Sequence, residues 1–83
     1  MNITLKCYAS LARHLPVDAK AHTAKIEINE GSTVHQVIVF LNIDPKETDL
    51  VILNGEFVYP PDRDSTLLVE SDTLALWPEV AGG

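Results

Sequence analysis

The sequence closes with WPEVAGG, residues 77 to 83, and its last two residues, Gly82 and Gly83, have the largest conformational freedom available to a polypeptide. Adjacent glycines resist being ordered, and no charged side chain follows Glu79. Terminal disorder would account for such a pair in a protein of any function. The chemical alternative is that the α-carboxylate of Gly83 is itself the reactive group, held beyond the folded body where other enzymes can modify it.

The remaining side chains offer no second reactive site. Cys7 is the only cysteine, and its place on the apolar side of an alternating segment indicates a core residue. The three histidines match no metal-ligand spacing and have no carboxylate or serine partner at a useful spacing: His14, His22 and His35. We therefore expect no metal site and no bound cofactor. A ferredoxin-type electron carrier is excluded because one cysteine cannot ligate an iron–sulfur cluster.

Length and charge restrict the classes of function further. With 83 residues, 46% of them apolar, the chain is expected to form one globular domain. The net charge of −6 is uneven, since residues 1–30 sum to +1 and residues 31–83 to −7. Such an acidic half argues against nucleic-acid binding and favours encounter with a basic protein surface. The longest apolar run is far shorter than a membrane span and the start does not read as a signal peptide, so we expect a cytoplasmic protein without membrane contact.

Alternation of apolar and polar residues predicts two strands in the first part of the chain. These strands cover residues 2–9 and 24–29 and could pair as an antiparallel ribbon. Residues 10–15 could form a short helical turn before Pro16, and a polar, irregular connection follows.

A helix, a hairpin and a last strand are predicted for the second part. Thr33 and Gln36 have the spacing of a capping box, and an apolar face follows at helical spacing: Val34, Val37, Ile38 and Leu41. Asn54-Gly55 supplies both positive-φ residues of a type I′ turn between strands over 50–53 and 56–59. The last strand is expected over 73–77, because Pro78 has no amide to give to a ladder.

These elements are most simply combined in an α+β domain that has one sheet and one main helix packed on one face. We expect residues 1–78 to form this domain and residues 79–83 to form a flexible C-terminal tail.

Three stretches carry a resemblance to a known family: Gly31-Ser32-Thr33-Val34, Leu53-Asn54-Gly55-Glu56, and DTLALWPEVAGG over residues 72–83. In this order they resemble the MoaD/ThiS family of ubiquitin-like sulfur carriers. The likeness covers nearly the whole chain, and the Pro-x-Val-Ala-Gly-Gly ending resembles the molybdopterin synthase small subunit more than the thiamine-pathway carrier. The resemblance implies a β-grasp fold with a mixed sheet of four to five strands.

The resemblance also implies a chemistry for the terminus. A ubiquitin-activating-type adenylating enzyme (MoeB/ThiF-like) would convert the Gly83 carboxylate to an acyl adenylate with ATP, and sulfur from a sulfurtransferase persulfide would then give a C-terminal thiocarboxylate. The chain would be a carrier and not an enzyme, and would donate sulfur to the pterin of a molybdenum or tungsten cofactor, in contact with a molybdopterin synthase large subunit (MoaE-like). Residues that thread into a partner would be Val80, Ala81 and Gly82. The partner surface would include Phe57, Trp77, Pro78 and Glu79.

Other functions stay open on the sequence alone. The sulfur acceptor could be the thiamine thiazole or another metabolite. A ubiquitin-like protein modifier would instead link Gly83 to a lysine of a target, and a pure interaction module on the same fold would leave the terminus unused.

Overall fold

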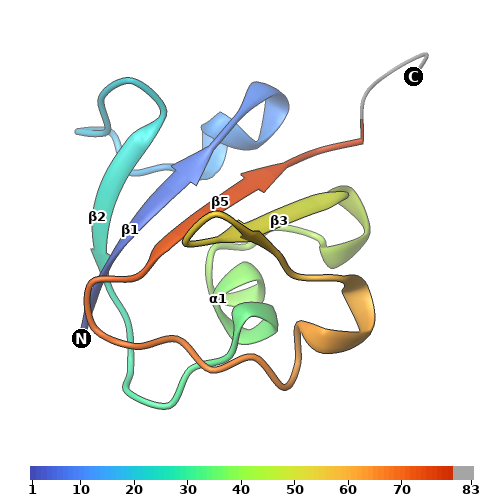
Figure 1. Ribbon diagram of the computed structural model, residues 1–83. Coiled ribbons are helices and arrows are strands. Elements are labelled where there is room, and N and C mark those ends of the chain that lie inside the picture. The colour runs from blue at the N-terminus through green and yellow to red at the C-terminus, as the bar shows by residue number, and fades with distance from the viewer. Residues whose placement is uncertain (80–83) are drawn as a thin grey trace.

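The strand that leads into the C-terminal residues lies at the centre of a five-stranded sheet with the order β2-β1-β5-β3-β4 (Figure 1). The computed structural model describes residues 1–79, so Val80, Ala81, Gly82 and Gly83 lie outside the described residues. The strands are β1 (Asn2–Cys7), β2 (Thr23–Glu27), β3 (Leu50–Leu53), β4 (Glu56–Phe57) and β5 (Thr73–Trp77). The helices are α1 (Val34–Phe40) and the 3₁₀ turns η1 (Ala9–His14), η2 (Pro45–Glu47) and η3 (Pro60–Asp62). Strands β1 and β5 run parallel and the other described pairs are antiparallel, which confirms a mixed sheet.

Helix α1 covers one face of the sheet, as predicted. The Thr33 side chain accepts a hydrogen bond from the Gln36 amide, and the Gln36 side chain accepts one from the Thr33 amide, which confirms the capping box. Three helix residues, Val34, Val37 and Ile38, are buried in the core. Sheet residues complete that core: Ile3, Leu5, Cys7, Val51, Leu74 and Leu76.

The predicted hairpin forms, but its second strand is shorter than expected. Asn54 and Gly55 have φ values of +50° and +87°, the left-handed conformations that the type I′ turn requires. Strand β4 ends at Phe57 because Pro60 begins η3, although the Val58 amide still donates to the Val51 carbonyl. The strands predicted over 50–53 and 73–77 are present with the same bounds, and the strands predicted over 2–9 and 24–29 and the helical turn over 10–15 are present with ends shifted by one or two residues. None of the helices in residues 1–79 has the length and apolar character needed to span a bilayer.

Candidate functional site

The end of β5 is hydrogen-bonded on both sides, through Leu76 toward β1 and through Trp77 toward β3, and the chain leaves the sheet directly after Trp77. The Leu76 carbonyl accepts from the Tyr8 amide (3.1 Å), and the Trp77 carbonyl accepts from the Asp49 amide (2.9 Å). Pro78 has no amide to continue the ladder. We call Trp77, Pro78 and Glu79, the last described residues, the tail base.

A buried arginine supports this base. The Arg63 guanidinium donates to three carbonyls, those of Thr48 (2.7 Å), Asp49 (3.1 Å) and Val58 (3.2 Å), and the residue is 7% exposed. Burial lowers the pKa of Arg63 from its ordinary value, and the nearby Asp49 carboxylate acts in the opposite direction. Arg63 thus holds the backbone of Thr48 and Asp49 in place. The Asp49 amide in turn donates to the Trp77 carbonyl.

An aromatic stack flanks the same end of β5. The rings of Tyr8 and Trp77 are nearly parallel, at 7°, with centroids 4.5 Å apart. His22 stacks on Tyr8 with centroids 5.5 Å apart. Stacked aromatic rings stabilise each other by more than the burial of their surface alone would give, so the Trp77 ring is held in place at the end of β5.

The face of the sheet opposite α1 carries a continuous apolar surface next to this stack. Residues that pair directly across neighbouring strands have their side chains on the same face of the sheet. The register pairs Ile52 of β3 with both Ala75 and Phe57, and it pairs Leu50 with Trp77. Tyr59 stacks on Phe57, and these two residues are 63% and 57% exposed. We call this surface the sheet-face patch, and its members are Tyr8, Leu50, Ile52, Phe57, Tyr59 and Trp77. An exposed apolar patch beside the tail base is typical of a protein-binding surface.

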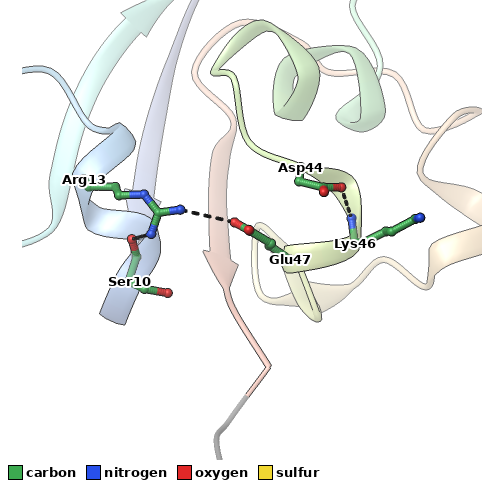
Figure 2. A network of polar contacts seen from close by, with 5 residues as sticks. All are labelled: Ser10, Arg13, Asp44, Lys46 and Glu47. Carbon is green, nitrogen blue, oxygen red and sulfur yellow. Dashed lines mark hydrogen bonds and ion pairs between the residues drawn. The ribbon is translucent and has the colours of Figure 1, made fainter.

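Charged residues lie on the other side of the tail base. Arg13 of η1 forms an ion pair with Glu47 of η2 (Nη2 to Oε2, 3.3 Å) and also donates to the Ser10 carbonyl (3.0 Å). In Figure 2 this pair lies across β5, with η1 on one side of the strand and η2 on the other. A hollow of about 240 Å³ is lined there by Ser10, Arg13, Lys46, Glu47, Pro78 and Glu79. Both side chains of the pair are about half exposed, so the pair adds little to the stability of the fold. It does place one positive and one negative charge beside the hollow.

Cys7 is a core residue, as predicted, and its thiol has low reactivity. Its side chain is fully buried, and burial raises the pKa of the thiol from 9.0 to about 11. The thiolate is the nucleophilic form of cysteine, so at neutral pH this sulfur is unreactive. Cys7 is therefore a poor candidate for a persulfide-bearing residue.

Replacement of Cys7 tests this assignment through the pH dependence of stability. Below pH 9 the thiol is protonated in both the folded and the unfolded chain, whereas between pH 9 and 11 only the unfolded chain ionises. We expect the free energy of unfolding to fall by about 2–3 kcal/mol more across this window in the unchanged protein than in Cys7→Ala. Urea unfolding of both proteins at a series of pH values measures the difference, and identical pH profiles would contradict a buried, neutral thiol.

The structure places some of the predicted site residues and leaves others outside its described part. Trp77, Pro78 and Glu79 lie together at the tail base, and Phe57 shares the sheet face with Trp77 two strands away. The proposed reactive residue Gly83 and the threading residues before it (Val80, Ala81, Gly82) are not among residues 1–79. Sequence reasoning missed Tyr8, Leu50 and Ile52 as members of the patch. Their alternation with buried neighbours was a usable signal, because it puts them on the face opposite the core.

Comparison with known proteins identifies a family and a fold. The model of the ThiS family matches residues 15–83, and a search of curated proteins gives no significant match. The solution structure of the HVO 2177 protein from Haloferax volcanii is 22% identical with a TM-score of 0.75, and the alignment covers 100% of this chain and 87% of that one.

Two further structures match over the full length of both chains. SAMP1 from Haloferax volcanii is 22% identical with a TM-score of 0.66, and 100% of each chain is covered. A chain from the complex of subunits 1 and 2 of the molybdopterin-converting factor from Helicobacter pylori 26695 is 17% identical with a TM-score of 0.57, again with 100% of each chain covered. The mixed five-stranded sheet with its single main helix is thus the ubiquitin-like β-grasp fold, as the sequence predicted.

Proposed function

Because the chain belongs to the ThiS family, whose members are small carrier proteins and not catalysts, we propose that it carries sulfur on the Gly83 carboxylate for molybdopterin biosynthesis in the cytoplasm. The observation that carries this proposal is that the Gly82-Gly83 ending follows closely in sequence after a central strand, which is hydrogen-bonded on the β1 side up to Leu76 and on the β3 side up to Trp77. A carrier of this kind needs a rigid body that a partner can recognise and a narrow segment that can enter the partner's active site.

The chemistry requires a partner because a carboxylate is a poor electrophile. An adenylating enzyme of the ubiquitin-activating type uses ATP to form the Gly83 acyl adenylate. The terminal sulfur of a sulfurtransferase persulfide then forms a C–S bond as the bond to AMP breaks, and reduction of the resulting acyl disulfide by a thiol leaves the thiocarboxylate. A thioacid is ionised at neutral pH, so no base on the carrier is needed to make it nucleophilic.

The residues before the terminus are small enough to pass through a narrow channel into a partner's active site. Glycine has no Cβ, and Val80 and Ala81 are small. Ordering each tail residue costs about 1–2 kcal/mol, which contacts made elsewhere must offset. The sheet-face patch is suited to supply such contacts to the adenylating enzyme and, in turn, to a large subunit of the molybdopterin synthase type.

Loading of the purified protein tests the proposal. Incubation with its cognate adenylating enzyme, ATP, a persulfide donor and a thiol reductant is expected to raise the intact mass by one sulfur-for-oxygen exchange, in fragments that contain Gly83. Omission of ATP is the control, and it should leave the mass unchanged. An unchanged mass with a partner that loads its own known carrier would overturn the proposal.

The acceptor is tested separately, because the matching model is that of the ThiS family and the thiamine thiazole is the alternative destination. Restoration of molybdoenzyme activity in cells that lack a molybdopterin carrier supports the proposed acceptor. Restoration of growth without thiamine, in cells that lack only the thiazole carrier, would assign the sulfur to the thiazole instead. Conjugates of higher mass that disappear when Gly83 is deleted would assign the chain to protein modification.

A further inference from the structure

The outer edge of β2 has backbone groups without a partner strand. In the β1–β2 ladder, Met1 and Ile28 exchange both of their hydrogen bonds, and the Cys7 amide donates to the His22 carbonyl. In an antiparallel ladder, hydrogen-bonded residue pairs alternate with non-hydrogen-bonded pairs, and Lys25 and Glu27 belong to the non-hydrogen-bonded pairs with β1. Their N–H and C=O groups therefore point away from β1. The Thr4 amide, opposite Lys25, correspondingly donates to the Asp72 carbonyl on the other side of β1. Lys25 and Glu27 thus present two donors and two acceptors at the sheet edge.

A hollow lies beside the end of this edge, on the side of the sheet that faces α1. It measures about 450 Å³ and lies between the chain that continues β2 and the helix. Buried Ile28 and Val37 form part of its apolar lining, together with Phe40, which is 67% exposed. Glu30 and the backbone of Glu27 border it, and no cation is among the lining residues. The hollow therefore combines an apolar contribution from Ile28, Val37 and Phe40 with polar and acidic lining residues.

We propose that the β2 edge and this hollow together bind an extended, basic segment of a partner protein, which adds to the sheet as a further antiparallel strand. Its backbone pairs with Lys25 and Glu27, and main-chain bonds of this kind supply affinity in strand addition. Side chains opposite Ile26 and Ile28 point to the α1 side of the sheet and should be apolar, so that they cover Ile26 and enter the hollow under Phe40. The side chain opposite Glu27 and the one that comes beside Glu30, in the turn after β2, should be basic, and the side chain opposite Lys25 should be acidic.

A second copy of this chain is a poorer occupant than such a segment. The charge-matched antiparallel register of two β2 edges pairs Lys25 with Glu27 of the other copy and therefore places Thr23 opposite Asn29. The outer side of Thr23 is already occupied, because Lys20 and Thr23 exchange backbone hydrogen bonds across a tight turn. In a self-paired dimer this turn would collide with Asn29 of the other copy. A peptide segment carries no such turn.

The proposed surface is remote from the tail base. Strand β2 runs antiparallel to β1 and β5 runs parallel to it, so the end of β2 and the end of β5 lie at opposite ends of the sheet (Figure 1). Strand β1 also separates β2 from β5. A segment bound at the β2 edge would leave the tail base open, and this inference stands independently of the proposed sulfur chemistry.

Titration of the ¹⁵N-labelled full chain with the acetylated, amidated peptide KSVKVE tests the proposal. In the inferred register, its last four residues lie in turn opposite Ile28, Glu27, Ile26 and Lys25, and its first lysine lies beside Glu30 in the turn that follows β2. We expect shift changes over residues 25–32 and 36–40 and slower amide exchange at Lys25 and Glu27. The isomer ESVKVK has the same composition but places like charges beside Glu30 and opposite Lys25, so it should bind about tenfold more weakly.

Variants separate this site from general charge attraction. The double change Lys25→Glu with Glu30→Lys is expected to reverse the preference between the two peptides. Phe40→Ser should weaken binding several-fold, whereas Val39→Ser, which removes an exposed side chain of α1 that does not line the hollow, should have no effect. Equal binding of both peptides, shift changes centred on Trp77 and Phe57, or protection of Lys25 and Glu27 by self-association without peptide would each overturn the proposal.

Discussion

Conversion of the Gly83 carboxylate to an amide is expected to abolish sulfur loading completely. The proposed adenylation forms its new bond at this carboxylate, and no described side chain can substitute for it. The amidated chain, made by peptide ligation, is compared with the unchanged chain by intact mass after incubation with the adenylating enzyme, ATP and a sulfur donor. Continued sulfur uptake by the amidated chain would contradict the assignment of Gly83.

A substitution that keeps the carboxylate tests the threading role of its neighbour. Gly82→Val places a β-branched side chain next to the reactive group, and a misplacement of about 1 Å at a reacting centre can cost roughly 10²-fold in rate. We expect a loss of about this size in kcat/KM for adenylation. The sheet hydrogen bonds of β5 end at Trp77, so the free energy of unfolding should stay unchanged in both proteins, and urea unfolding provides that control.

Removal of the buried guanidinium is expected to have the largest effect on stability. Arg63→Met fills much of the same volume but leaves the carbonyls of Thr48, Asp49 and Val58 without their donor. Buried acceptors left unpaired make a loss of about 2–4 kcal/mol the expected result in urea unfolding. Amide exchange at Asp49, whose N–H bonds the Trp77 carbonyl, should accelerate as well.

Two matched changes distinguish this role from a general effect of charge. Arg63→Lys keeps the charge but lacks the planar fork, so it should recover only part of the stability. Arg13→Met removes an exposed cation whose ion pair with Glu47 is worth at most about 1 kcal/mol. If Arg63→Met unfolds at the same urea concentration as Arg13→Met, Arg63 does not support the tail base in the way described.

Local signals in the sequence predicted the elements well. The capping box depends only on Thr33 and Gln36, three residues apart, and the type I′ turn only on Asn54 and Gly55, so both were readable without knowledge of the fold. Strand β5 was predicted with its observed bounds because Pro78 ends its ladder. The second hairpin strand was predicted too long because η3 takes the chain away from β3.

Long-range features were not predictable in the same way. The stack of Tyr8 on Trp77 depends on the parallel pairing of β1 with β5, which joins segments nearly 70 residues apart in the chain. Burial of Arg63 runs against the usual exposure of arginine, and its three carbonyl partners come from two other loops. The free edge of β2 follows from the sheet order, which no local pattern encodes.

The intact mass of the untagged protein, taken directly from its own cells, tests the central claim most directly. We expect a species that is heavier than the unmodified chain by one sulfur-for-oxygen exchange, with the change located at Gly83. A thiol-selective alkylating reagent, applied under native conditions, should react with this species and not with the unmodified chain, because Cys7 is buried. If no chain carries this exchange in cells that are actively making molybdopterin, the central claim is contradicted.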